Sequence, residues 1–237
     1  MVDSSLRGVQ QHRHTRPVIQ RYIPIGVVAP MRIEFRQIAH LRSEHMLIRH
    51  SGVGPDRASA AAKALIHEGC RLIISWGFCG ALGNLEVGDI VRATTVIDAA
   101  TNQRLSCSLP LPDTVISTDQ VAHRRSKVDL ANSGAVAVDM ESAAIARACI
   151  AEKLAFAVLR VVVDDRQASW PSRFEDFSVG GPWGRLALAI QHPRELLVAL
   201  SCIYRGKTGL KRLSSELEGF SRRALFGNSE CNRKFSP

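Results

Sequence analysis

The sequence contains little that would indicate a metal centre, a redox site or a membrane span. The six cysteines include no C-x-x-C pair, and the eight histidines form no H-E-x-x-H motif. These absences argue against a zinc ribbon and a thioredoxin-like site, and we expect no metal site. The late apolar run from Leu196 to Tyr204 is too short to cross a bilayer.

The N-terminal residues lack the apolar core of a secretory signal, because residues 1–17 are polar. Several cysteines lie within apolar stretches, where cysteine behaves as a small buried hydrophobe. Both observations favour a reduced compartment, and we expect a cytoplasmic protein.

Positive charge is abundant but unevenly distributed along the 237 residues. The formal net charge is +9, which by itself suggests a polyanionic partner. Residues 1–22 carry a net +3 and residues 203–237 a net +5, so that residues 23–202 carry only +1. The chain also has few aromatic side chains, 5%, and shows no aromatic stacking platform. We therefore expect no nucleic-acid partner.

Composition and patterning divide the chain into three parts. We predict a polar, basic tail over 1–22, a catalytic domain over 23–204 and a basic, partly amphipathic segment over 205–237. Hydrophobic residues make up 46% of the chain, close to the usual value for a globular domain. The catalytic domain is long enough to bury one large core.

Short apolar strands alternate with helices through the predicted domain. Strands are predicted at Tyr22–Ala29, Met46–Arg49, Leu72–Ser75, Asp89–Ala93, Thr95–Asp98, Ala135–Val138 and Phe156–Val163, and helices at Ala58–His67, Ser142–Lys153, Arg185–Ala189 and Pro193–Tyr204. Loops are predicted at 76–80 and 180–184. This alternation indicates an α/β domain whose binding site lies beyond the carboxyl ends of the strands.

Acidic residues and glycines follow several of these strands. Gly52 and Gly54, before a helix, could cradle an anion or simply form a tight turn. Asp164 follows the most apolar strand, where a carboxyl group could act as a general acid or cap a helix. Glu141 could be an acid in the first turn of a helix, favoured by the helix dipole. Arg57 could hold phosphate or lie on the surface.

The order of the motifs resembles the nucleoside phosphorylase and nucleosidase superfamily over about 23–170. The segments are IPIGVVAPMRIEF, SGVGPDRASAAAKALIHEG, LIISWGFCGALGNLEVGDIV, STDQV, AVAVDMESAAIARAC and FAVLRVVVDD. They are similar in style to methylthioadenosine/S-adenosylhomocysteine nucleosidases and most similar to hopanoid-associated phosphorylases. The resemblance implies a three-layer α/β fold with a mixed, mostly parallel, twisted central sheet between helices, and a homo-oligomer.

Roles for individual residues follow from this resemblance. Asp164 matches the acid that protonates the leaving purine at N7, and Glu34 matches the glutamate that activates water in the hydrolytic members. Glu141 matches the glutamate that binds the ribose hydroxyls, and Met140 packs under the sugar. Gly77 and Phe78 match residues that line the base and sugar pocket, although the family more often has a small or hydroxyl residue at the position of Phe78.

The function implied is cleavage of a purine N-glycosidic bond with release of adenine, with adenosylhopane as the predicted substrate. No organic cofactor is expected. Glu34 favours water as the attacking group, whereas Gly54 and Arg57 could hold inorganic phosphate as a co-substrate, and the nearest resemblance favours phosphorolysis. The alternatives are a nucleosidase or phosphorylase of small nucleosides such as methylthioadenosine, and a non-catalytic nucleoside-binding protein.

Two further features concern the substrate and the C-terminal segment. Only residues 92–116 separate the GDIV and STDQ motifs. The resembled nucleosidases of small thio-nucleosides carry a longer insertion there that helps to close the pocket, so the resemblance implies a more open mouth beside the 5′ end of the ribose. The segment 206–226 has an apolar stripe at Leu210, Leu213, Leu217 and Phe220. It could lie on an anionic membrane, or it could pack on the domain or on a neighbouring subunit.

Overall fold

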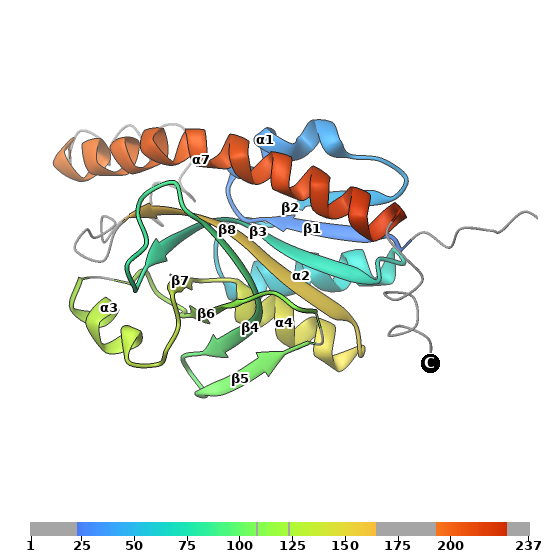
Figure 1. Cartoon of the computed structure of the whole chain (residues 1–237), viewed down its shortest axis with the longest axis horizontal. Helices are drawn as coiled ribbons and strands as arrows, with labels where there is room; N and C mark the ends of the chain where they lie inside the picture. Colours follow the sequence, from blue (N-terminus) through green and yellow to red (C-terminus); the bar gives the residue numbers. More distant parts are fainter. Residues whose placement is uncertain (1–22, 108, 123, 165–192, 227–237) are drawn as a thin grey trace, which may run out of the picture.

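A computed structural model describes residues 23–107, 109–122, 124–164 and 193–226, which are arranged around one mixed sheet (Figure 1). The strands are β1 (Ile25–Ala29), β2 (Met46–His50), β3 (Leu72–Ala81), β4 (Ile90–Asp98), β5 (Gln103–Ser106), β6 (Asp113–Ser117), β7 (Ala137–Asp139) and β8 (Ala155–Asp164). The helices are α1 (Arg32–Ile38), η1 (Ala39–Leu41), α2 (Pro55–His67), α3 (Arg124–Ala131), α4 (Ser142–Ala151) and α7 (Pro193–Phe226). The predicted loop at 180–184 and helix at 185–189 lie outside the described residues.

The strand order is β2-β1-β3-β7-β6-β4-β5, and β8 pairs with both β3 and β4. Five of the strand pairs are parallel, and three, β3–β7, β4–β5 and β4–β8, are antiparallel. This confirms the predicted mixed, mostly parallel sheet. Because β8 pairs with β3 and β4, the strands β3, β7, β6, β4 and β8 form a closed ring.

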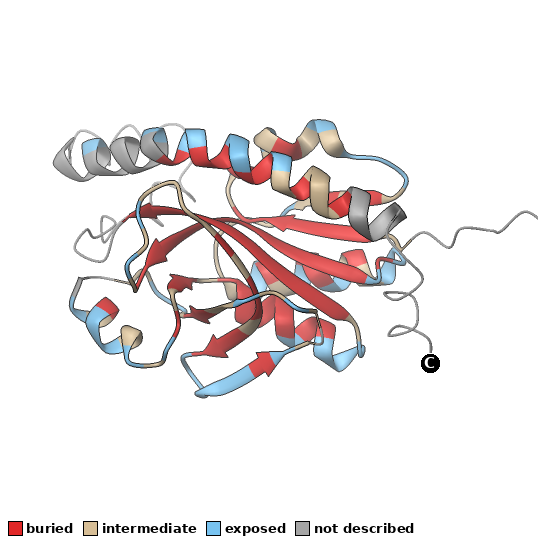
Figure 2. Ribbon diagram, viewed as in Figure 1, coloured by how far each residue is buried: buried red, intermediate tan, exposed pale blue. Residues whose placement is uncertain are grey.

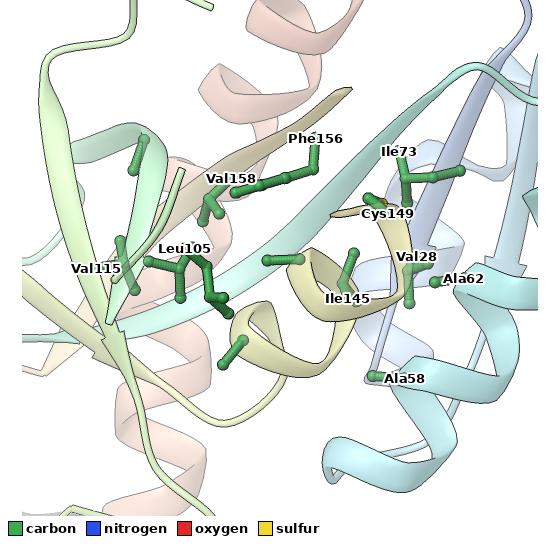
Figure 3. Packing of buried hydrophobic residues seen from close by; sticks show 14 of the residues in the cluster. Val28, Ala58, Ala62, Ile73, Leu105, Val115, Ile145, Cys149, Phe156 and Val158 are labelled. Carbon is green, nitrogen blue, oxygen red and sulfur yellow. The ribbon is translucent and has the colours of Figure 1, made fainter. Parts of the chain in front are cut away.

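Helices cover both faces of the sheet, and each face has its own hydrophobic core. One core contains Val28, Ala62, Ile73, Ile145 and Phe156 and lies between the sheet and the helices α2 and α4 (Figure 3). The other lies beneath α1 and α7. The strands β3 and β8 are buried along their whole lengths, as Figure 2 shows, because they contribute side chains to both cores.

The strand β3 is longer than predicted. The segment 76–80 was expected to be a loop, but it continues the strand to Ala81. Its backbone pairs with β8 as far as Gly80, and then with Val138 and Ala137 of β7. The glycines at 77 and 80 suggested a loop, yet continuous pairing with β8 keeps this segment extended. Gly77 and Phe78 therefore lie on a rigid strand.

The boundary predicted between 204 and 205 falls inside one continuous helix. The apolar stripe of α7 faces the sheet, and Leu210, Leu213 and Leu217 are at most 1% exposed. Phe220 packs against the same core. The membrane interpretation of this stripe is therefore wrong, because its apolar face is already buried in the domain. The alternative, a helix packed on the domain, is correct for these residues. The predicted basic tail over 1–22 lies outside the described part of the chain.

Close packing of α7 on β8 depends on two glycines. A Cβ atom on Gly206 would lie 2.5 Å from Cγ1 of Val163, and one on Gly209 would lie 2.3 Å from Cγ2 of Val161. Carbon atoms cannot approach so closely, so a side chain at either position would displace the helix. No helix of the described residues has an apolar stretch of the length that a transmembrane segment requires.

We predict that Gly209→Ala lowers the free energy of unfolding by about 1–3 kcal/mol, because the new methyl group overlaps Val161. The matched control is Gly83→Ala, since a Cβ atom there would meet nothing within 4 Å. Its effect should stay within about 0.5 kcal/mol. Urea unfolding of the three proteins measures both values. Equal stability of the two variants would contradict the described packing of α7.

Candidate active site

The candidate site is a cavity beside the carboxyl ends of β3, β7 and β8. Its empty volume is about 610 Å³, including the part open to solvent. Apolar side chains line much of it, among them Met31, Val53, Phe78 and Met140. The polar lining includes four carboxylates and two cations, namely Glu34, Asp139, Glu141, Asp164, Lys127 and Arg160.

Glu34 lies in the first turn of α1 and is 1% exposed. Its Oε2 accepts a hydrogen bond of 2.7 Å from the Met31 N–H, and its Oε1 accepts one of 2.8 Å from the Phe78 N–H. Burial raises the pKa of Glu34 from 4.5 to about 7, against the opposing effects of Arg160 and these two N–H donors. A carboxyl group with this pKa can take or give a proton near neutral pH.

Gly77 leaves the space that the Glu34 carboxylate occupies. A Cβ atom on Gly77 would lie 2.3 Å from Oε1 of Glu34, and the residue has a φ of +151°. Both the close approach and the backbone conformation require glycine here. Gly77 was predicted to line the pocket, and its observed role is to make room for the carboxylate.

Glu141 lies just before α4 and is held from two sides. Its Oε1 accepts a hydrogen bond of 3.1 Å from the Gly54 N–H, and its Oε2 accepts one of 3.2 Å from Nη2 of Arg160. Burial raises its pKa, and Arg160 opposes that shift. Met140 precedes it on the cavity wall. The Gly54 N–H thus positions a carboxylate of the protein itself, whereas the sequence suggested that it could bind an anionic ligand such as phosphate.

Arg160 connects the strands that form the back of the site. Its guanidinium donates hydrogen bonds to the Phe78 carbonyl at 3.1 Å and to Oγ of Ser75 at 2.8 Å. Its Nη2 lies 2.9 Å from Oδ2 of Asp139. Asp139 in turn accepts hydrogen bonds from the hydroxyl groups of Ser117 and Ser142. These contacts join β8, β3, β7, β6 and the start of α4.

Asp164 is the last residue of β8 and forms a buried ion pair with Lys127 of α3. Both side chains are at most 1% exposed. Asp164 and Arg160 both line the cavity, although the pairing of β8 with β3 shifts by one residue between Val162 and Asp164. The carboxyl group of Asp164 thus faces the same cavity as Glu34 and Glu141.

Of the predicted site residues, five line the cavity together, namely Glu34, Met140, Glu141, Phe78 and Asp164. Gly54 and Gly77, which were also predicted, are not among the lining residues. Arg57 is exposed on α2 and does not line the cavity, which agrees with the surface interpretation. Asp139, Lys127 and Arg160 were missed. The single arginine within the apolar run FAVLRVVV was a usable signal for Arg160, because a charge in a buried strand needs partners.

The chain shares its fold with nucleoside-cleaving enzymes. A sequence model described as the phosphorylase superfamily matches residues 13–124. The apo structure of 5′-methylthioadenosine nucleosidase from Arabidopsis thaliana is 16% identical, with a TM-score of 0.64, over 87% of this chain and 99% of that one. The family match and the shared fold confirm the predicted resemblance to the phosphorylase superfamily.

Two further solved structures have the same fold. The 5′-methylthioadenosine/S-adenosylhomocysteine nucleosidase of Helicobacter pylori is 17% identical, with a TM-score of 0.55, over 83% of this chain and 100% of that one. A mutant futalosine hydrolase of Helicobacter pylori is 16% identical, with a TM-score of 0.54, over 82% and 99%. We found no significant match among curated proteins.

We predict that ionisation of Glu34 destabilises the folded protein as the pH rises. The folded-state pKa of about 7 lies above the ordinary 4.5. Between pH 4.5 and pH 7 the folded chain therefore keeps a proton on Glu34 that the unfolded chain has lost. The stabilising effect is present in full below pH 4.5 and is lost as the pH rises through 7. Relative to Glu34→Gln, the free energy of unfolding of the wild type should fall by up to about 3 kcal/mol between pH 5 and pH 8.

Urea unfolding of both proteins at the two pH values tests this prediction, with Glu152→Gln as the control because Glu152 is exposed at the end of α4. A stability difference between wild type and Glu34→Gln that does not change with pH would show that Glu34 has an ordinary pKa.

Proposed function

We propose that the protein hydrolyses the N-glycosidic bond of an adenine nucleoside and releases adenine. The observation that carries this proposal is the convergence of Glu34, Glu141 and Asp164, from three distant segments, on one cavity. Cleavage of this bond passes through a cationic, oxocarbenium-like sugar, so it needs carboxylates near the sugar and a proton for the leaving base.

Each carboxylate has a distinct role in this proposal. Glu34, with a pKa of about 7, takes a proton from the water that attacks C1′ of the ribose. Glu141 accepts hydrogen bonds from the ribose hydroxyls, and its orientation is fixed by Gly54 and Arg160. Asp164 delivers a proton to N7 of the purine as the bond to the sugar breaks. No organic cofactor takes part.

Three observations favour water over phosphate as the attacking group. The cations among the described lining residues, Lys127 and Arg160, are both in ion pairs with carboxylates. Carboxylates outnumber cations around the cavity, so a phosphate dianion would meet unfavourable charge. Gly54 and Arg57, the predicted phosphate ligands, face Glu141 and the surface respectively. The proposal therefore replaces the earlier preference for phosphorolysis with hydrolysis.

The proposed substrate carries a bulky apolar group on the 5′ carbon, and adenosylhopane has this chemistry. The lining of the cavity supports such a group, because Pro30, Val53, Val121 and Ala122 offer apolar surface. The connection between β4 and β6 is also short, since it contains only the small hairpin strand β5. Methylthioadenosine, with a small 5′ group, is the alternative substrate.

We predict that the purified protein releases adenine and free sugar from such a nucleoside in the absence of phosphate. Asp164→Asn and Glu34→Gln should each lower kcat by about 10²–10⁴-fold, because each removes one proton-transfer group. Asp129→Asn and Glu152→Gln are the matched controls, since both side chains are exposed outside the cavity. Chromatography of the base and the sugar measures the products.

No adenine release with any adenine nucleoside would favour a non-catalytic binding protein over the proposed enzyme. Appearance of a sugar phosphate, in a reaction that requires added phosphate, would replace hydrolysis by phosphorolysis.

We also predict a preference for long 5′ groups. An adenosyl substrate with a long alkyl chain should have a kcat/KM at least about tenfold above that of methylthioadenosine, because each buried methylene contributes about 0.8 kcal/mol. A series of 5′-alkylthio-adenosines of increasing chain length measures this dependence. A kcat/KM that is flat or that falls with chain length would favour a small nucleoside as the substrate.

A further inference from the structure

Lys127 is an unusual residue for its position in α3. The helix turns this lysine into the protein, where it is 1% exposed, while Val128 beside it is 47% exposed. Its neighbours Arg125 and Asp129 also face solvent. Hydrophobic packing would favour the opposite orientation, with the valine inside. The position of Lys127 therefore calls for an explanation other than the packing of the helix.

The partner of Lys127 is the candidate acid. Its Nζ forms the ion pair with Oδ2 of Asp164, at the wall of the cavity. Burial of an ammonium group is expensive, and a closely held carboxylate offsets much of that expense. Gly80 leaves the space for this pair, because a Cβ atom there would lie 2.8 Å from Oδ1 of Asp164 and 3.2 Å from Nζ of Lys127.

The ion pair has a consequence for the proposed reaction. A carboxylate that is paired with an ammonium group is ionised, so it has no proton of its own for the leaving purine. Nζ of Lys127 holds a proton in direct contact with this carboxylate. Adenine offers a matching edge, with N7 as an acceptor and the 6-amino group as a donor. Once it has received a proton, the carboxyl group of Asp164 would offer a donor to N7 and an acceptor to the 6-amino group.

We propose that Lys127 is the source of the proton that the leaving adenine receives, with Asp164 as the group that transfers it. This inference rests on the proposed N-glycosidic cleavage. As the bond between N9 and C1′ breaks, its electron pair passes to the purine. A proton moves from Nζ of Lys127 to the Asp164 carboxylate, and a proton moves from Asp164 to N7.

The other half of the reaction balances these transfers. Water attacks C1′ and gives its proton to Glu34, while Lys127 is left as a neutral amine. Loss of a proton from Glu34 to solvent and uptake of one by Lys127 then restore the starting state. Lys127 thus acts through Asp164: it holds the carboxyl group in place and supplies the proton that this group passes on.

The test compares two leaving groups. Adenine needs a proton to leave, whereas nitrophenolate leaves readily as an anion. We expect Lys127→Met to lower kcat for the adenine nucleoside by about 10²–10⁴-fold, with a change in KM below about threefold. The kcat for nitrophenyl riboside should change by less than about fivefold, because that reaction does not use the proton.

A second variant separates the charge from the proton. Lys127→Arg keeps a positive charge beside Asp164, but a guanidinium group does not give up its proton in proteins. It should show the same selective loss with the adenine nucleoside. The matched control is Lys63→Met, because Lys63 is exposed on α2, and its rates should equal those of the wild type.

Equal losses for both leaving groups in Lys127→Met would overturn this proposal and leave Lys127 a structural residue. Full activity of Lys127→Arg on the adenine nucleoside would likewise show that only the charge is needed. Failure of the proposed function is a different result, in which the wild type itself releases no adenine. Thermal unfolding of each variant shows whether a loss of activity reflects a loss of folded protein.

Discussion

Arg160 brings a positive charge into the interior of the sheet, and the arrangement of the cavity follows from the way in which that charge is compensated. An unpaired charge at this depth would be strongly destabilising, so Asp139 and Glu141 must stay within reach of the guanidinium. The same group donates to the Phe78 carbonyl and thereby fixes the strand whose N–H orients Glu34. One buried cation thus sets the positions of residues that come from three separate parts of the chain.

The carboxylates of the cavity differ in their surroundings, and this difference allows different chemistry at each. Glu34 is held by two backbone N–H groups, and burial brings its pKa near neutrality. Glu141 and Asp164 each contact a buried cation, Arg160 and Lys127 respectively. In the proposed reaction, groups of one chemical type therefore serve as a proton acceptor, a ligand for hydroxyls and a relay, according to what lies beside them.

Much of this arrangement could be predicted from the sequence, because apolar strands followed by acidic residues indicate both the α/β fold and the edge at which its site lies. The strand preceding Asp164 was predicted almost to the residue. The extended course of β3 through Gly77 and Gly80 could not be predicted, since it depends on pairing with β7 and β8. The role of Lys127 could not be predicted either. A lysine in the polar segment RRSKVDLA is expected to be solvated, and its partner Asp164 is distant in the sequence.

The packing of α7 has a consequence that reaches the cavity. Gly206 brings the helix backbone close to both Val163, which precedes Asp164, and Phe78, whose N–H orients Glu34. A substitution that shifts the helix by a fraction of an ångström would therefore displace both carboxylates to which the proposal assigns proton transfer. If the proposed reaction holds, a change within α7 could alter its rate while every residue that lines the cavity stays the same.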